Sequence, residues 1–523
     1  MSLWISWTAA AFARAKAQGK PILAAVGPLP PEHLKADEGE IARHFVAVLA
    51  DPETRPDAAM RIGLDHAVVL DLDGARRAVL PLPSPALGES LARLALEAVA
   101  PLRPDAPAIS VWTGAVRETE LSAAPDETMI SSIFSAFSAL PDAQTDPVLV
   151  ESLLHVAGER GDAAARAALM KALEVRWSGW DPARRSFLPG SGSPLMTHAR
   201  WASLFWDAHA LTGEARWRAA AADISEHLLR SLWDSGAGAF RRAGRTESAV
   251  YPAYGNALAA SALLRAHAYG HPGAGEAALK TLTFLQSRLY DPASGLRHSV
   301  GGEGESVGGL LGDAAATALA FTDGFLATGM KAHREFADVI LRFLFRELWE
   351  RESGGFLDRV ARAGDPAILR EPHVDPTLNA VALEVCRRMY HLKGNHNYRR
   401  WLDWGLRSAW NLEMRDSPAS RGRAGLARVA DLHARGRMDF ELVGRPGEPK
   451  ADALLAAVNR PYLPRKVISF VDPDDQDYLL AHRFQAETYP RVFGCGADLR
   501  RLADASEPAG VPAVVEAVKG EEK

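Results

Sequence analysis

The chain holds few thiols, since only Cys386 and Cys495 occur among its 523 residues. So few cysteines exclude a disulfide framework and favour a reducing compartment, so we expect a cytoplasmic protein. No apolar stretch reaches the roughly 18 residues that a membrane span needs. Basic residues are not in surplus, because 60 Lys and Arg face 65 Asp and Glu, a net charge of -5. Neither a membrane nor a nucleic acid is therefore expected as a partner.

Motifs for metals and phosphates are lacking as well. The Cys and His residues do not follow the spacing of zinc ligands. A glycine-rich run at 301–309 lacks the Gly-Lys-Ser/Thr ending of a phosphate loop. We therefore predict no metal and no cofactor. Hydrophobic residues make up 47% and charged residues 24%, as in an ordinary globular protein.

What the chain does contain is a recurring turn, in which an aromatic residue is followed by an acid and then by small residues. It begins at Trp180, Trp233, Tyr290 and Trp349 and returns roughly every 55 to 60 residues, near the range of stacked repeats. After each turn comes a loop and then a helix of about 20 residues that ends at glycine. These helices are expected at 194–213, 252–270, 310–329 and 376–394. The repeating unit is therefore a helical hairpin.

The two helices of each hairpin differ in character. The first, as at 310–321, is small and apolar almost all round, which is typical of a helix buried on every side. The second carries charges along one face, as at 331–342, and should meet water there. An inner and an outer ring of helices follow from this difference. We predict a toroid of six hairpins, an (α/α)6 barrel, over 126–437.

The flanking regions have another pattern. Residues 1–105 alternate short apolar strands with helices, which predicts a small α/β domain. A connector follows at 106–125, and a β-α-β tail is expected at 438–515. The charged end, 516–523, should fray. The fold class is thus multidomain and mainly α.

The N-terminal region also carries a resemblance. The run Trp-Thr-Ala-Ala-Ala-Phe-Ala-Arg-Ala-Lys-Ala-Gln-Gly-Lys-Pro-Ile-Leu at 7–23 resembles the opening of the thioredoxin-like domain of the spermatogenesis-associated protein 20 family. The resemblance continues at 45–48 and 68–71, and in Gly-Gly-Phe at 354–356 and Pro-Thr-Leu-Asn at 376–379. It implies a thioredoxin-like domain joined to a six-hairpin barrel similar to sugar epimerases and glycosidases.

The chain departs from that family where the redox chemistry should lie. The family has Cys-His-Trp-Cys after its first strand, whereas here Gly27 is followed by Pro-Leu-Pro-Pro-Glu-His. Asp65 and His66 stand where the family has Trp-Pro. Thiol–disulfide exchange needs a thiolate pair. We therefore predict a redox-inactive domain with a structural role, and no thiol–disulfide oxidoreductase.

In a toroid, the loops and the N-terminal ends of the inner helices converge on one end of the bore, which makes that end the default site. A base and an acid near neutral pH suit sugar isomerase or epimerase chemistry, for which His198 and His373 are candidates. Two carboxylates suit glycoside hydrolysis, for which Asp313 with Asp375 or Glu371 are candidates. The catalytic candidates are His198, Asp313, His373 and Asp375, and the substrate-binding candidates are Trp201, Tyr254, Asn256, Glu371 and Asn379.

Structural roles compete with these assignments. His198 can serve as a hydrogen-bonded residue at a helix start, and Asp313 and Asp375 can act as helix caps. We expect a carbohydrate-like small-molecule ligand, with isomerase or epimerase chemistry favoured over hydrolysis if the barrel is an enzyme. The alternative is a non-catalytic scaffold with a vestigial cavity.

Overall fold

The computed structural model describes residues 3–27, 30–82, 87–100, 126–138, 145–187, 193–244, 249–302, 306–351, 354–413, 420–496 and 499–521. The chain forms two compact units. The N-terminal unit comprises Met1–Ala115, Glu305–Leu310 and Leu357–His373, and the toroid unit comprises Val116–Gly304, Leu311–Phe356 and Val374–Lys523. The expected connector at 106–125 lies outside the described residues.

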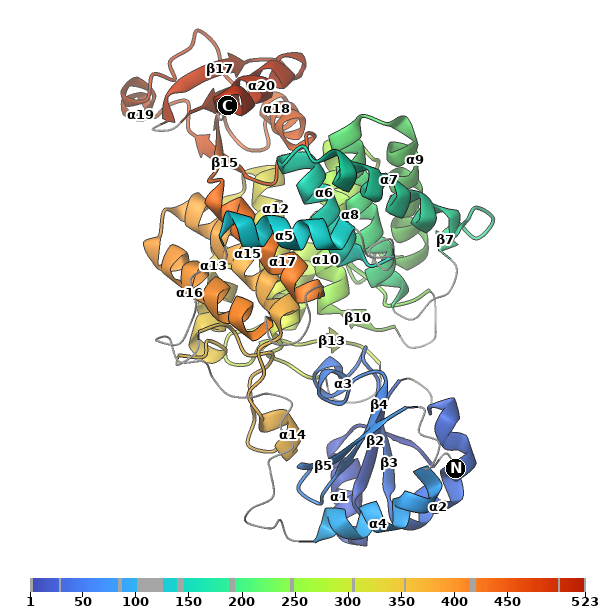
Figure 1. Ribbon diagram of the computed structural model, residues 1–523. Coiled ribbons are helices and arrows are strands. Elements are labelled where there is room, and N and C mark those ends of the chain that lie inside the picture. The colour runs from blue at the N-terminus through green and yellow to red at the C-terminus, as the bar shows by residue number, and fades with distance from the viewer. Residues whose placement is uncertain are drawn as a thin grey trace. The chain divides into compact units, whose positions relative to one another are not determined.

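The N-terminal unit is built on a five-stranded sheet of order β1-β3-β2-β4-β5 (Figure 1). Strands β1, β3 and β2 run parallel, while β4 is antiparallel to both β2 and β5. Every residue of β2 is buried, because helices cover both faces of the sheet. The strands are β1 (Ile5–Ser6), β2 (Ile22–Val26), β3 (Val46–Ala50), β4 (His66–Leu70) and β5 (Arg76–Pro81), and the helices are α1 (Ala9–Gln18), α2 (Glu38–His44), α3 (Pro56–Ile62) and α4 (Leu87–Val99).

Two later segments of the chain belong to this unit, although the sequence assigned them to the barrel. The longer one, Leu357–His373, contains the short helix α14 (Ala367–Arg370). Ile368 and Leu369 join the hydrophobic cluster beneath α1 and α3. Their loop lies against Gly74, where an added Cβ would come within 2.6 Å of Pro366 and φ is +78°. Glycine is therefore required at that turn.

The toroid unit contains twelve helices of the predicted hairpins within the described residues. They are α5 (Glu127–Ser138), α6 (Pro147–Glu159), α7 (Ala163–Ser178), α8 (Pro194–Thr212), α9 (Ala215–His227), α10 (Ala253–Ala268), α11 (Ala274–Phe284), α12 (Leu311–Thr328), α13 (Lys331–Glu347), α15 (Pro376–Lys393), α16 (His396–Glu413) and α17 (Arg421–Ala434). The four inner helices that the sequence indicated are confirmed. Two of them, α8 and α15, end at a left-handed glycine as expected.

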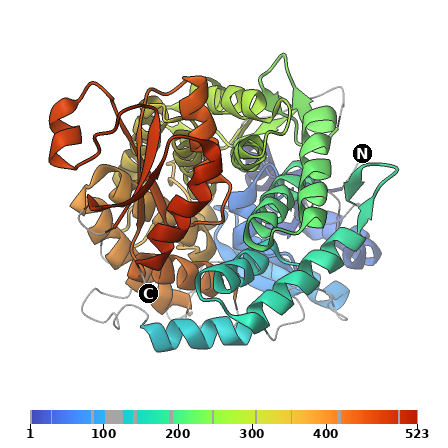
Figure 2. The ribbon, with the colours of Figure 1, turned by 90° about the horizontal axis from the view of Figure 1, so that it is seen from above.

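Six of these helices form a closed inner ring. In the order α6, α8, α10, α12, α15 and α17, each packs on the next, and α17 packs back on α6 (Figure 2). At that last seam, Asp431 of α17 accepts hydrogen bonds from His155 Nε2 at 2.7 Å and from Arg160 Nη2 at 2.8 Å. The predicted toroid is therefore confirmed, and an open solenoid is excluded.

The recurring aromatic–acid turns are short hairpins. Trp180 pairs with Phe187, Trp233 with Phe240, Tyr290 with Leu296 and Trp349 with Phe356. The acid closes the turn, since Asp234 Oδ1 accepts from the backbone N–H groups of Gly236 and Ala237. The strands are β6 (Trp180–Asp181), β7 (Ser186–Phe187), β8 (Trp233–Asp234), β9 (Ala239–Phe240), β11 (Tyr290–Asp291) and β12 (Gly295–Leu296), and β10 (Tyr251–Pro252) pairs with β13 (Ser299–Val300).

A four-stranded sheet of order β15-β14-β16-β17 completes the toroid unit. The expected β-α-β tail is its parallel part, which is β14 (Met438–Val443), α18 (Pro449–Asn459) and β15 (Lys466–Val471). Strands β16 (Arg491–Cys495) and β17 (Arg501–Ala505) and helices α19 (Gln476–Ala481) and α20 (Val511–Gly520) add to it. Of the end that was expected to fray, residues 516–520 belong to α20, where Val518 is buried, and 522–523 lie outside the described residues.

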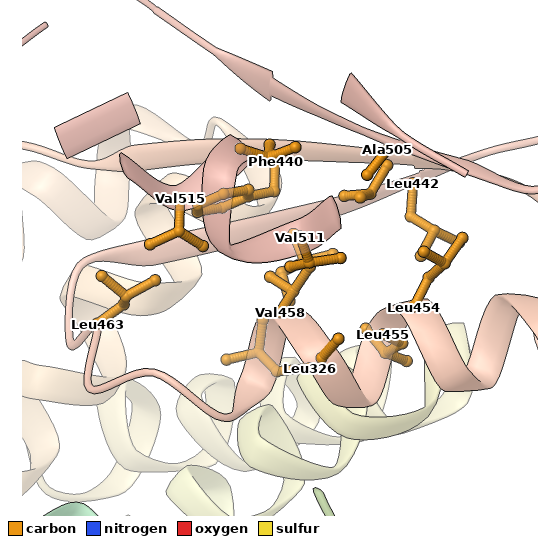
Figure 3. Packing of buried hydrophobic residues seen from close by; sticks show 14 of the residues in the cluster. Leu326, Phe440, Leu442, Leu454, Leu455, Val458, Leu463, Ala505, Val511 and Val515 are labelled. Atoms are coloured by element: carbon orange, nitrogen blue, oxygen red, sulfur yellow. The ribbon is translucent and has the colours of Figure 1, made fainter. Parts of the chain in front are cut away.

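This sheet is anchored on the inner ring. Helices α18 and α20 cover one face of the sheet and enclose a cluster that includes Phe440, Leu454 and Val515 (Figure 3). Phe325 and Leu326, near the end of α12, belong to the same cluster. The sheet therefore sits against the C-terminal ends of the inner helices. Among the described helices, none combines the length and apolarity that crossing a membrane requires.

Candidate functional site

Two predicted site residues make the same set of contacts. Asn256 accepts from Phe240 N at 2.7 Å and donates to Phe240 O at 2.9 Å. Asn379 repeats this with Phe356, at 2.8 and 2.9 Å. Each asparagine sits near the start of an inner helix and holds the aromatic–acid hairpin that precedes the helix. We call these residues turn clamps.

His198 is the turn clamp of α8. Its Nε2 accepts from Phe187 N at 3.3 Å, and its Nδ1 lies 2.6 Å from the Pro194 carbonyl. The ring stacks on His227 with centroids 4.2 Å apart. Burial, with the nearby His227 and Arg176, lowers the pKa of His198 to about 4. A neutral, hydrogen-bonded imidazole of this kind serves first to hold the hairpin.

Asp313 occupies the corresponding place in α12. Its carboxylate lies 2.9 Å from His298 Nδ1, and both side chains are nearly buried. His298 lies two residues after Leu296, the last residue of the hairpin that begins at Tyr290. The contact thus joins α12 to its own preceding turn, as the other clamps do. His298 was not predicted, because only the tertiary structure brings it to Asp313.

The other predicted residues of the toroid unit have separate surroundings. Trp201 is only 2% exposed and packs on Phe205. The Tyr254 hydroxyl accepts a hydrogen bond from Arg200. Asp375 caps α15, its Oδ1 accepting from Leu378 N at 2.8 Å, and burial raises its pKa. The capping alternative for Asp375 is therefore confirmed.

Glu371 and His373 belong to the N-terminal unit. Arg61 donates to the Glu371 carbonyl at 2.8 Å and to Asp358 Oδ1 at 3.0 Å. Burial, together with Arg61 and Arg76, lowers the pKa of His373 to about 4. Of the pairs expected from the sequence, His198 with His373 and Asp313 with Glu371 therefore consist of residues from different units, whereas Asp313 and Asp375 both belong to the toroid unit.

A second set of polar residues lies further along the inner helices. Each inner helix carries one charged side chain that lines a common cavity. We call this set the charge ring; its members are Glu151 of α6, Asp207 of α8, Arg265 of α10, Asp323 of α12, Arg388 of α15 and Arg428 of α17.

Ion pairs link neighbours around the charge ring. Arg265 Nε donates to Asp207 Oδ1 at 3.0 Å, and its Nη1 lies 3.7 Å from Asp323 Oδ2. Arg388 Nη1 donates to Asp323 Oδ1 at 2.6 Å. Arg428 Nη2 lies 3.3 Å from Glu151 Oε1. Three carboxylates thus face three guanidinium groups, so the charge ring balances itself.

The chain segment between α18 and β15 closes the cavity from the other side. Asn459, Tyr462 and Lys466 line it. Asn459 Nδ2 donates to the Leu326 carbonyl at 2.7 Å, which fixes the segment on α12. The cavity has a volume of about 120 Å³. Burial raises the pKa of Asp207 and lowers that of Lys466 to about 8, as expected for ionisable groups withdrawn from bulk water.

Sequence reasoning missed the charge ring, although a periodic signal was present. A charged residue follows nine residues after His198, Asn256 and Asn379, and ten after Asp313. On an α-helix, nine residues advance about 13 Å and turn through about 900°, which ends on the opposite face. The turn clamp and the charge-ring residue of one helix therefore lie far apart along the helix and on opposite faces of it. In α10 and α12 the signal was a charge far from the helix start in an otherwise small, apolar sequence.

No family model and no curated protein matches this chain. Among solved structures, a glycoside hydrolase family 76 α-1,6-mannanase from Salegentibacter is similar with a TM-score of 0.47 at 12% identity, covering 59% of this chain and 99% of the other. An α-mannanase of the same family from Bacteroides thetaiotaomicron gives 0.46 at 12%, covering 59% and 94%. A cellobiose 2-epimerase from Spirochaeta thermophila gives 0.35 at 15%, covering 58% and 98%. Likeness at this level carries no argument about chemistry, which has to come from the side chains.

Proposed function

We propose that the toroid binds a small, polar, carbohydrate-related molecule in the cavity enclosed by the charge ring. The observation that supports this is the convergence of one charged side chain from each of the six inner helices on a single space. Pockets within helical bundles with a few convergent polar groups are the usual ligand sites of such folds.

The polar groups suit a ligand with several hydroxyl groups. Carboxylates such as Asp207 and Asp323 accept hydrogen bonds, and guanidinium groups such as Arg265 and Arg388 donate them. Because the ring is already neutral as a whole, a neutral polyol or sugar fits it better than a multiply charged anion. The ion pairs also hold the side chains in place before binding, which lowers the entropy cost of association.

The volume limits the ligand. About 120 Å³ equals the share of roughly four water molecules in the liquid, and an engineered cavity of about 150 Å³ takes benzene. A triose has as many non-hydrogen atoms as benzene. We therefore expect a triose-sized molecule, or one end of a larger sugar that reaches solvent past Glu151, whose side chain is 42% exposed.

We infer that the N-terminal unit is a thioredoxin-like domain without redox activity. The strand order β1-β3-β2-β4-β5, with the last two strands antiparallel, supports the fold predicted from the resemblance. No cysteine occurs in residues 1–105, and both thiols of the chain are buried in the toroid unit. The buried ion pairs of Arg61 with Asp358 and of Asp57 with Arg359 favour a structural role, because they tie α3 to the segment Leu357–His373.

A non-catalytic scaffold is the second candidate. It is favoured by the way in which the ring charges satisfy one another, since a closed ionic network also holds six helices together. The acid–base roles of His198, Asp313, His373 and Asp375, in an isomerase, epimerase or hydrolase, stay predictions. The hydrogen bonds of His198 and Asp375 point first to structural roles.

A thermal-shift screen with trioses, hexoses, sugar acids and polyols tests the proposal. A ligand at about 100 times its Kd should add about 2.7 kcal/mol of stability. Asp323→Asn removes a negative charge that Arg265 and Arg388 share. It should lower the apparent affinity for the ligand, taken from the ligand-induced shift in unfolding temperature, at least tenfold. Arg216→Ala is the matched control, since it breaks an exposed ion pair with Glu174.

Two results would favour the scaffold instead. One is that no compound in the panel raises the unfolding temperature of the unmodified protein. The other is a ligand-induced shift that Asp323→Asn and Arg216→Ala leave equally intact, which would place the binding site elsewhere.

A further inference from the structure

Lys466 differs from the other charged residues that line the cavity. Its Nζ has one long hydrogen bond, 3.4 Å to the Asn459 carbonyl. Within the described part of the chain, no carboxylate lies within ion-pair distance of it, whereas every member of the charge ring has such a partner. Because the ring is balanced without it, a proton on Lys466 would be an uncompensated charge.

The surroundings of Lys466 favour the free amine. Desolvation, followed by the repulsion of Arg265, lowers its pKa to about 8 and outweighs the opposite effect of the carboxylates of Asp207 and Asp323. At pH 7.5 about a quarter of such an amine is neutral, compared with about one part in a thousand for a lysine with the ordinary pKa near 10.5. A neutral amine is a nucleophile toward carbonyl carbon, and desolvated lysines are the ones that proteins use for this chemistry.

We propose that Lys466 forms an imine with the carbonyl group of a small hydroxyaldehyde or hydroxyketone held in the charge-ring cavity. This inference rests on the proposed ligand site and adds the reacting group. An open-chain sugar carries a carbonyl group, and the cavity has the size of a triose.

The step balances without a further reactant. The lone pair of Nζ attacks the carbonyl carbon, the C–O π bond opens, and a proton passes from nitrogen to oxygen to give a carbinolamine. The nitrogen lone pair then forms the C=N bond as the C–O bond breaks, and the second N–H proton passes to the leaving hydroxyl, which departs as water. Asp207 and Tyr462 line the same cavity, and their side chains carry groups that can pass these protons. Burial raises the pKa of Asp207, which favours a carboxyl able to carry one.

Hydride trapping tests the proposal on the full chain. The protein is incubated with glyceraldehyde and cyanoborohydride at pH 7.5, which converts an imine into a stable secondary amine, and peptides are mapped by mass spectrometry at intervals. We expect Lys466 to be labelled at least tenfold faster than Lys393, whose ammonium is paired with Glu335 at 2.7 Å and Asp338 at 3.1 Å. The rate at Lys466 should rise with pH around a midpoint near 8.

Variants and a second ligand separate the outcomes. Lys466→Met should abolish the fast label, while Lys393→Met should keep it, and the comparison of lysines within the unmodified protein needs no variant to fold. Labelling of Lys466 at the rate of Lys393 would overturn the inference. If erythritol, which has no carbonyl group, still raises the unfolding temperature in that case, the ligand site stands and only the imine fails.

Discussion

Replacing Asn256 with alanine tests whether the predicted site residues of the inner helices hold the fold or a ligand. The amide is fully buried, and it pairs with both the N–H and the carbonyl of Phe240 and with the Pro252 carbonyl. Alanine leaves the two Phe240 groups without this partner. Each buried polar group that loses its partner costs about 1–3 kcal/mol, so we expect a loss of about 3 kcal/mol in the free energy of unfolding.

The size of the effect can be measured by thermal unfolding, followed by circular dichroism. At about 2 °C per kcal/mol, the value for large domains, the unfolding temperature should fall by about 6 °C. Asn379→Ala should give nearly the same decrease, because its contacts with Phe356 have the same lengths within 0.1 Å. Tyr254→Phe is the control on the same helix, since it removes only a half-buried hydroxyl and should change stability by less than about 1 kcal/mol.

The reasoning is refuted if Asn256→Ala unfolds at the temperature of the unmodified protein. The two asparagines make equal contacts, so their alanine variants should lose equal stability. The reasoning is therefore also refuted if the losses in free energy of unfolding of Asn256→Ala and Asn379→Ala differ by more than about 2 kcal/mol. A variant that keeps its stability but loses ligand-induced stabilisation would show that Asn256 contacts the ligand instead.

Three further predictions follow from the buried polar groups. The pKa of His198 is about 4 in the folded chain, below the ordinary histidine value of about 6.5, so the unfolded chain binds a proton first and stability falls as the pH drops. Between pH 7 and 5 the loss should be about 2 kcal/mol, and His198→Asn, which places the clamp residue of α10 and α15 in α8, should flatten this slope in thermal melts. Asp431→Ala leaves His155 without its carboxylate partner at the seam of the ring and leaves Arg160 with Glu127 as its remaining carboxylate partner, and should cost about 3–5 kcal/mol in the same melts; an unchanged unfolding temperature would mean that the seam does not depend on Asp431. Neither Cys386 nor Cys495 should react with Ellman's reagent until the protein is denatured, because both thiols are buried, and burial raises the pKa of Cys495 to about 12; rapid reaction of the native protein would contradict this.

Much of the fold could be predicted because the signals are local. Helix length, capping glycine and apolar character follow from neighbouring residues, and they predicted α8, α10, α12 and α15 close to their observed ends. Strand β16 was missed, since its pairing partner β14 lies some 50 residues earlier in the chain, and β17 was missed with it because β17 pairs with β16 rather than with β14. The segment Leu357–His373 was assigned to the barrel because chain position gives no sign that its apolar residues are buried with α1 and α3.

The candidate site was harder to predict than the fold. Polar residues at helix starts attract attention, but His198, Asn256 and Asn379 turn inward to the preceding hairpin, a direction that depends on where that hairpin lies. Asp207 and Arg265 meet only because α8 and α10 are neighbours in the ring. Lys466 reaches the cavity from the far side, on a segment that follows the last inner helix by some 30 residues.

By itself, the sequence determined the repeating hairpin, the two classes of helix, and the absence of a thiol pair in the N-terminal region. These properties depend on backbone preference, hydrophobic period and composition, which are set within a few turns of chain. Only the tertiary structure decided which charges share a cavity and which polar side chains are already occupied in holding a turn. Electrostatic and hydrogen-bonding partners are chosen by distance in space, and residues from six separate helices come within a few ångströms only when the ring has closed.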